Sequence, residues 1–231
     1  MPPALPPGQH EVARLMRFGL LPFAERFPRD PAVAIQLRGE LRNTVTVAGE
    51  LRRLSRVEQR SDFHCVTTWS CRALVWGGYR FADFYRDIVI PLAGPSPDAR
   101  FVVLRAQDGA RTSLPLEDLM ADDVLLADRL NGEPLPIAHG APLRLVAPSH
   151  YGYKSLKHVD RIDFLTSDAA YRPVGFRFMQ HPRARVALEE RGQWVPGWLL
   201  RLLYRPLIGL TARRFERALA AHGGAAPPRE R

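Results

Sequence analysis

The alternation of apolar and polar residues along the first third of the chain predicts short β-strands. Segments 32–39 (AVAIQLRG) and 43–51 (NTVTVAGEL) alternate, are rich in β-branched residues, and are bounded by glycine or asparagine. This pattern is typical of half-buried strands between turns. Strand propensity returns at 66–69 and 73–76, within an aromatic-rich stretch.

The middle of the chain predicts a hairpin and two further strands. Segments 101–105 and 111–114 are strand-like and flank an Asp-Gly pair, which is a strong signal for a hairpin turn. Segment 141–148 has the apolar content of a strand, and 159–166 alternates apolar and polar positions.

Three segments have the pattern of helices. Segment 81–92 gathers apolar residues on one side, 116–132 predicts one helix or two short ones ended by Asn131–Gly132, and 10–18 predicts a short helix. Strands and helices do not alternate regularly. The pattern therefore predicts an α+β fold of mainly short, mixed β-strands with irregular connections and peripheral helices, rather than a parallel sheet.

The same pattern divides the chain into four parts. Residues 1–31, proline-rich at both ends, predict an arm that wraps a domain at 32–180. Residues 181–222 predict an arginine-rich helical extension interrupted at Pro206, and 223–231 predict a disordered tail. We expect the extension to pack on the domain, to contact a redox partner, or to rest on an anionic membrane surface.

Composition narrows the class of protein. The 231 residues are 46% hydrophobic and 25% charged, which is typical of a large globular domain. Two cysteines do not make a disulfide framework, no apolar run is long enough to cross a membrane, and the first residues show no secretory signal. We therefore expect a cytoplasmic protein with free thiols.

The net charge of +9 is unevenly distributed. Residues 181–231 contain ten arginines and four carboxylates, so +6 of the total lies there. The rest of the chain is close to neutral, and we expect no nucleic-acid partner for it. A basic protein that binds nucleic acid or an anionic membrane through the C-terminal region stays an alternative.

Cys65 lies in the stretch DFHCVTTWS among apolar and aromatic residues. Three roles fit it: a metal ligand where a cofactor supplies the other ligands, a nucleophile with His64 or another histidine as its base, and a buried core thiol. Cys71 has no motif of its own and is interpreted as a core thiol.

The stretch YGYKSLKH contains Lys154 and Lys157, the only two lysines among 33 basic residues. Two compact ammonium groups, the Ser155 hydroxyl and nearby backbone amides have the chemistry of an anion site, to which Arg144 adds a guanidinium. The alternative is two solvated surface charges. The preference for arginine elsewhere in the chain favours the anion site.

Together the two motifs resemble a known family. DFHCVTTWS, followed downstream by HGAPLRLVAPSHYGYKSLKHVDRI, is similar to the molybdopterin-binding domain of the sulfite oxidase superfamily. The similarity is greatest to the bacterial branch that includes the catalytic subunit of protein-methionine-sulfoxide reductase. It covers roughly residues 10–165, and the order of the two motifs makes it specific.

This resemblance implies a Mo-molybdopterin cofactor with Cys65 as the protein ligand of molybdenum. It implies that the pterin or its phosphate contacts His139, which replaces an asparagine of the reductase branch, and Arg144. The phosphate would be held by Ser155, Leu156 (through its backbone) and Lys157, with Lys154 adding to the positive field. Arg17 and Phe18 resemble part of the segment that folds over the cofactor.

The resemblance also implies two-electron oxygen-atom transfer on a small substrate, with sulfur compounds as candidates. A separate electron-transfer partner is expected because the sequence has no haem, flavin or iron–sulfur motif. No motif matches the sulfite pocket of the family, so sulfite itself is not assigned. A cofactor-free descendant that serves as an interaction module is a further alternative.

Overall fold

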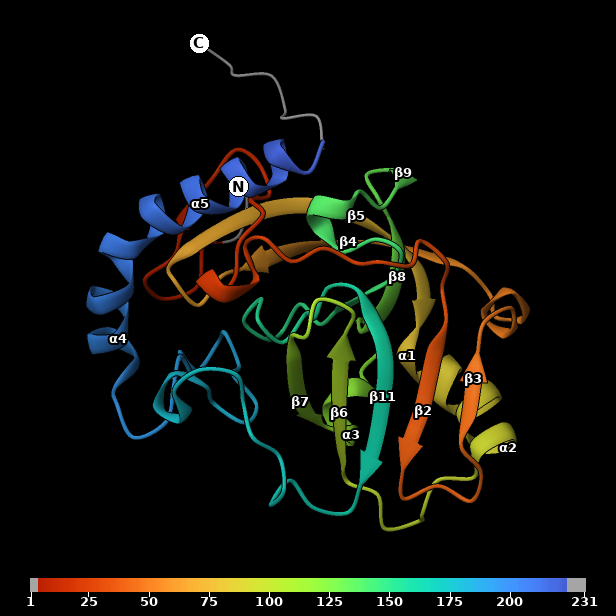
Figure 1. Ribbon diagram of the computed structural model, residues 1–231. Helices are drawn as coiled ribbons and strands as arrows, with labels where there is room; N and C mark the ends of the chain where they lie inside the picture. The colour runs from red at the N-terminus through yellow and green to blue at the C-terminus, as the bar shows by residue number, and fades with distance from the viewer. Residues whose placement is uncertain (1–3, 224–231) are drawn as a thin grey trace.

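The computed structural model describes residues 4–223 and consists of two β-sheets with few helices (Figure 1). One sheet has the order β1-β5-β8-β10, with β4 paired to β5 and β9 paired to β8; its strands are β1 His10–Glu11, β4 Val57–His64, β5 Trp69–Arg80, β8 Leu125–Leu130, β9 Glu133–Pro134 and β10 Arg144–Val146. The other has the order β3-β2-β11-β6-β7, with strands β2 Ile35–Gly39, β3 Val45–Val47, β6 Phe101–Ala106, β7 Arg111–Pro115 and β11 Val159–Leu165. The predicted α+β class is confirmed.

The main core lies between the two sheets. In β2, Ile35 and Leu37 are buried while Gln36 and Arg38 are exposed, as alternation along a half-buried strand requires. Leu126 of β8 joins the same core from the other sheet. Burial of these side chains is the main force that holds the sheets together.

A second core lies on the other face of the β1–β10 sheet. Its members include Leu125 and Ala127, the neighbours of Leu126 in β8, so successive residues of this strand serve opposite cores. Cys65 and Trp69 belong to it, and residues of the N-terminal arm pack on it. This second core positions the turn that contains Cys65.

The helices are short and peripheral (Figure 1). The predicted helix at 81–92 is observed as α1 Phe81–Phe84, a π-helical turn Tyr85–Val89 and α2 Ile90–Ala93; the others are α3 Leu116–Leu119, α4 Gly197–Tyr204 and α5 Ile208–Ala221. A 3₁₀ turn at Arg205–Leu207 joins α4 to α5 at the predicted break. Within residues 4–223, no helix has the length and apolarity needed to cross a membrane.

The prediction of helix throughout 116–132 is wrong. Only α3 is helical, and the second half forms β8, which pairs with β5, β9 and β10. Leu125, Leu126 and Ala127 are all fully buried, because β8 is covered on both faces. A strand of this kind has a continuous apolar run, which periodicity alone does not distinguish from a buried helix.

Two smaller predictions are also wrong. Segment 10–18 is extended rather than helical: His10–Glu11 pairs with β5 in parallel, and the amide of Val12 donates to the Ser70 carbonyl at 2.8 Å. Residues 66–69 form a turn and the first residue of β5, while β4 was not predicted. β4 pairs only with β5, and such an edge strand has a weak apolar pattern. The predicted tail at 223–231 lies outside the described residues except for Gly223.

Candidate functional site

Cys65 occupies a tight turn between β4 and β5. Its amide donates to the Trp69 carbonyl at 2.8 Å, and the Thr68 amide donates to the Cys65 carbonyl at 3.1 Å. The thiol is buried and lies 3.1 Å from the Thr67 hydroxyl. Strands on both sides of a four-residue turn fix the position of the sulfur, as a metal ligand requires.

Burial and the neighbouring charges have opposite effects on the pKa of Cys65. Burial raises the pKa of the Cys65 thiol, whereas the hydrogen bond with Thr67 and the charges of Arg191 and Lys157 lower it. A thiolate is the form that binds metals. The two cations partly offset burial, which is the larger effect, so the pKa of the Cys65 thiol stays above its ordinary value.

His64 is engaged away from the thiol. Its Nδ1 lies 2.8 Å from the Ser70 hydroxyl, which in turn donates to the Gln9 side chain at 3.0 Å. Desolvation lowers the pKa of His64. Among the described residues no histidine hydrogen-bonds to Cys65, so the arrangement favours the ligand role over a nucleophile paired with a histidine base.

The predicted anion loop follows β10 and packs against the Cys65 strand. The Gly152 amide donates to the His64 carbonyl at 2.7 Å, which brings the two motifs side by side. A Cβ atom at Gly152 would lie 2.2 Å from Cζ of Phe63, so only glycine allows this approach. The two motifs found in the sequence therefore form one region of the fold.

The loop contributes to a cavity of about 120 Å³. Its walls include five residues predicted to contact the cofactor: Arg17, Phe18, Ser155, Leu156 and Lys157. Cys65 does not line it directly. Two residues of the cavity wall link the cavity to the Cys65 turn. The charge of Lys157 acts on the thiol, and the Phe18 ring meets the ring of Trp69, at the end of that turn, edge-on at 5.8 Å.

Lys157 lines this cavity, together with Arg17 and Arg111. Its Nζ donates to the Phe18 carbonyl at 3.2 Å and lies 5.8 Å from the centre of the Phe215 ring. Burial lowers the pKa of Lys157 to about 7, and the like charges of Arg144 and Arg17 add to this effect. An anion in the cavity would stabilise the protonated ammonium and offset both its burial and the repulsion by the neighbouring arginines.

Ser155 and Leu156 are held by hydrogen bonds within the loop. The Ser155 hydroxyl accepts from the Ala147 amide at 3.0 Å and retains its own proton to donate. The Leu156 amide, predicted to hold the phosphate, donates instead to the Lys154 carbonyl at 2.9 Å. Leu156 thus lines the cavity while its amide is engaged elsewhere.

Lys154 points away from the cavity, contrary to its predicted role. Its Nζ donates to the carbonyls of Ser113 and Pro182, at 2.6 Å each. Burial lowers its pKa to about 7. A flexible ammonium reaches these two carbonyls inside the fold, and this ties β7 to the segment after residue 180.

Arg144 and His139 also lie behind the cavity wall rather than in it. The Arg144 guanidinium donates to the carbonyls of His139 at 2.7 Å and Ser155 at 2.9 Å, and lies over the Trp76 ring at 4.8 Å. Burial lowers the pKa of Arg144 to about 9. Burial and the neighbouring cations lower the pKa of His139 to about 3, so this imidazole is neutral. Because its guanidinium holds the carbonyls of His139 and Ser155, Arg144 positions the loop.

Arg17 and Phe18 bring the N-terminal arm to the site. Arg17 donates to the carbonyls of Ala24 at 2.7 Å and Phe215 at 3.2 Å, and burial lowers its pKa to about 10. Phe18 stacks on Phe215 with ring centroids 6.4 Å apart. The arm and α5 thus close the cavity together.

Three residues of the C-terminal extension belong to the site and were missed in the sequence. Phe215 of α5 lines the cavity. Arg191 is fully buried and donates to the Val66 carbonyl at 2.6 Å, next to Cys65. Tyr204 of α4 is buried, and burial raises its pKa to about 12, with the Arg191 charge opposing this shift and the neighbouring Cys65 adding to it. Their aromatic and basic character was visible, but their proximity to Cys65 was not.

The site contains donors that lack a partner, which is the condition a polar cofactor would satisfy. Trp69 Nε1, Trp76 Nε1, Arg17 Nε and the Tyr204 hydroxyl are buried without a hydrogen bond. Such groups are rare because each costs free energy. Within residues 4–223, no cluster of three or more His, Cys, Asp or Glu side chains could hold a metal. The fit is therefore to a metal whose remaining ligands come from a cofactor.

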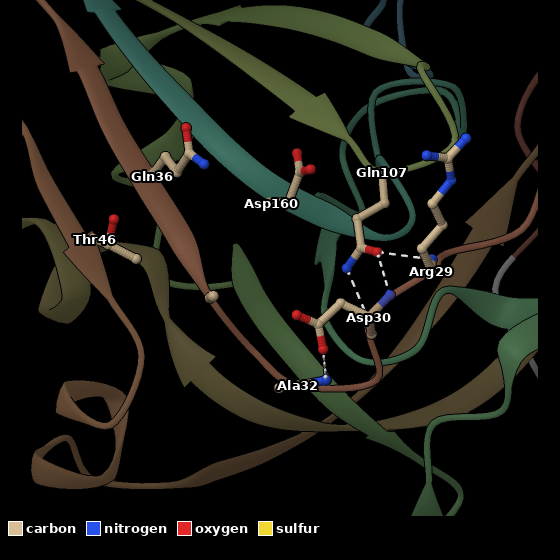
Figure 2. Close-up of a pocket in the computed structure, with 8 residues that line it drawn as sticks. Arg29, Asp30, Ala32, Gln36, Thr46, Gln107 and Asp160 are labelled. Atoms are coloured by element: carbon tan, nitrogen blue, oxygen red, sulfur yellow. Dashed lines mark hydrogen bonds between the residues drawn. The ribbon is translucent and has the colours of Figure 1, made fainter.

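A second hollow, of about 290 Å³, lies beside the start of β2, the start of β11 and the turn that follows β6 (Figure 2). There the Gln107 carboxamide oxygen accepts from the amides of Arg29 and Asp30, and its nitrogen donates to the Asp30 carbonyl. Figure 2 shows these groups paired with one another. None of the predicted site residues lines this hollow, so it is not the candidate site.

Comparisons with known proteins identify the family of this chain. The model of the oxidoreductase molybdopterin binding domain matches residues 27–171. The uncharacterized oxidoreductase YuiH of Bacillus subtilis (strain 168) is 42% identical over 115 residues, which cover 50% of this chain and 56% of that protein. The putative protein-methionine-sulfoxide reductase subunit YedZ1 of Azospira oryzae is 30% identical over 118 residues, which cover 51% and 42%.

Among solved structures, the sulfane dehydrogenase SoxCD from Paracoccus pantotrophus aligns with a TM-score of 0.52 at 22% identity, over 66% of this chain and 44% of that one. At this identity the similarity concerns the fold. The chain spans about half the length of the curated relatives it matches. The C-terminal extension lies outside the residues matched by the family model.

Proposed function

The chain belongs to the oxidoreductase molybdopterin binding domain family, and from that premise we propose that it is a Mo-molybdopterin enzyme that transfers an oxygen atom to or from a small substrate in a two-electron step. The proposal rests mainly on one observation. A buried cysteine in a tight turn feels the charges of Arg191 and Lys157, and Lys157 lines a cavity together with other residues of the second motif.

We assign the cofactor contacts as follows. Cys65 ligates the metal, and Lys157, Arg17 and the Ser155 hydroxyl hold the phosphate. Phosphate carries about two negative charges at neutral pH, and these three groups offer two cations and one hydroxyl around the same cavity. Arg144 positions the loop through the carbonyls on either side, and Lys154 stabilises the fold behind it.

When bound, the cofactor supplies the two-electron oxygen-transfer chemistry, and the protein binds, orients and encloses it. The unpartnered donors Trp69 Nε1 and Tyr204 Oη are suited to hold polar atoms of cofactor or substrate near Cys65. Because Tyr204 keeps its proton, it acts as a donor at neutral pH. Burial of the thiol keeps water away from the metal ligand.

We propose a small sulfur-containing substrate and a separate electron-transfer partner. The printed name of the YedZ1 relative, a protein-methionine-sulfoxide reductase subunit, supports sulfur chemistry. A two-electron reaction needs a second protein or carrier to restore the starting oxidation state. Both cysteines are free thiols, and we place the protein in the cytoplasm.

Metal and pterin analysis of the purified protein tests this function. We expect one molybdenum and one pterin per chain from a host that makes the cofactor, and loss of most of the molybdenum in Cys65→Ser. The matched control is Cys71→Ser, since Cys71 is a buried thiol of the same core and should keep its metal. Molybdenum that is absent from the wild type, or retained by Cys65→Ser, would contradict the assignment.

A further inference from the structure

The helices of the C-terminal extension have two different faces. Leu200, Tyr204, Phe215 and Ala218 are buried against the rest of the protein. The opposite side is solvent-exposed and apolar at its start; this outer face consists of Trp198, Leu199, Leu202, Leu203, Leu207 and Leu210. Figure 1 shows α4 at the periphery, with no other element covering it on that side.

The outer face is the largest concentration of exposed apolar side chains in the described structure. With Trp194 in the preceding loop, residues 194–210 contain seven of the thirteen large exposed hydrophobic residues within 4–223. Trp198 and Leu202, like Leu199 and Leu203, are four apart and therefore neighbours on one helix side. Scattered exposed leucines are ordinary, but a contiguous patch marks an interaction surface.

The charge around the outer face is strongly positive. Residues 192–222 contain five arginines and one glutamate. Arg205 lies among the exposed leucines and has no ion pair with any described residue. Arg213 and Arg217 continue along the exposed side of α5, beyond Leu210. The surface thus combines an apolar patch with Arg205, which has no carboxylate partner among the described residues, and with the exposed arginines of α5.

We propose that this outer face binds the surface of an anionic lipid bilayer. Tryptophan and leucine side chains enter the boundary between headgroups and acyl chains, while arginines contact anionic headgroups. A nucleic acid would leave the exposed leucines without apolar contacts, and the observations therefore favour lipid. The helix α4, with eight residues, lies along the boundary rather than across it.

Vesicle sedimentation with the full chain tests the proposal, and it requires no cofactor, so its result is independent of the molybdenum assignment. We expect binding to equimolar phosphatidylcholine and phosphatidylglycerol, little binding to phosphatidylcholine alone, and weakening by salt. Tryptophan emission should shift to shorter wavelength on binding. Trp69 and Trp76 are fully buried, so this shift reports on Trp194 and Trp198.

Substitutions separate the apolar from the ionic contribution. The pair Trp198→Gln and Leu202→Gln should weaken binding roughly tenfold or more, and Arg205→Gln about fivefold on anionic vesicles. The matched control is Ile90→Gln in α2, similarly exposed but on the opposite side of the molecule, which should bind as wild type (Figure 1). All these side chains are exposed, so the fold should persist, as circular dichroism would verify.

Several results would overturn the proposal. One is the absence of vesicle binding, and another is a double variant that binds as well as Ile90→Gln. A dimer that forms in solution without vesicle binding, and that the double variant abolishes, would assign the face to a second copy of the chain. Binding to duplex DNA but not to vesicles would assign it to nucleic acid.

Discussion

The cavity next to Cys65 has two walls of different origin. One wall comes from the family domain and supplies the Lys157 ammonium and the Ser155 hydroxyl, and the charge of Lys157 acts on the Cys65 thiol. The other comes from the C-terminal extension and supplies the Phe215 ring, with the Tyr204 hydroxyl and the Arg191 guanidinium close to Cys65. We therefore include the extension in the candidate site, because Phe215 lines the cavity and Tyr204 and Arg191 lie close to Cys65.

Among the substitutions in the wall formed by the C-terminal extension, Arg191→Met is expected to have the largest effect. This fully buried guanidinium donates to the carbonyls of Val66 and Pro7 and pairs with Glu189. Its loss leaves two carbonyls without a donor and removes one of the two arginines that pair with Glu189, and we expect the free energy of unfolding to fall by about 3 kcal/mol.

Urea denaturation measures this effect. The control is Arg185→Met, which removes an arginine that pairs with Glu190 but is partly solvent-exposed, and whose loss should be much smaller. Equal losses in the two variants would mean that the buried arginine does not organise the Cys65 turn.

Substitution of each lysine separates two roles: Lys157 is proposed to bind the cofactor, and Lys154 to stabilise the fold. Lys154→Met leaves the Ser113 and Pro182 carbonyls unpaired, and we expect a loss of about 2 kcal/mol in the free energy of unfolding. Lys157→Met removes a buried charge that faces other cations, so the cofactor-free protein should lose less than ~1 kcal/mol while pterin retention falls at least roughly tenfold.

Denaturation of the cofactor-free protein and pterin analysis after dialysis measure the two effects. The expected pattern is a crossover, in which each lysine variant fails in the assay where the other succeeds. If both variants lose pterin equally without any change in stability, the division of roles between the lysines is wrong.

The smallest expected effect on stability is that of Tyr204→Phe. The hydroxyl is buried without a partner, so its removal should change the free energy of unfolding by less than ~1 kcal/mol, in the stabilising direction. If the hydroxyl donates to substrate, turnover should fall several-fold with molybdenum content unchanged. A loss of stability instead would show that Tyr204 has a structural partner.

The sequence predicted the parts of the molecule that depend on local pattern. The hairpin of β6 and β7, the helix after Arg80 and the α+β class follow from turn chemistry and periodicity. β8 was missed because a fully buried strand and a buried helix share an apolar run. β4 was missed because its edge position leaves little apolar pattern.

The candidate site was only partly predictable for a related reason. The two motifs identify Cys65 and the lysine loop, but not which lysine faces the cavity. That depends on the carbonyls of Ser113 and Pro182, which are far from Lys154 in sequence. Arg191, Tyr204 and Phe215 have no motif, since their roles follow from how the extension folds back across the domain.

The closure of the cavity by Phe215 has a consequence for how the protein matures. At about 120 Å³ the space is smaller than the roughly 300 Å³ at which ligand pockets begin. Arg17 ties the carbonyl of Phe215 to the N-terminal arm, so the two ends of the chain close over the cavity together. A cofactor larger than this space must enter before the N-terminal arm and α5 pack together over the cavity, or while they are apart. On the proposed cofactor assignment, we expect insertion to require that α5 has not yet packed over the cavity or has moved away from it.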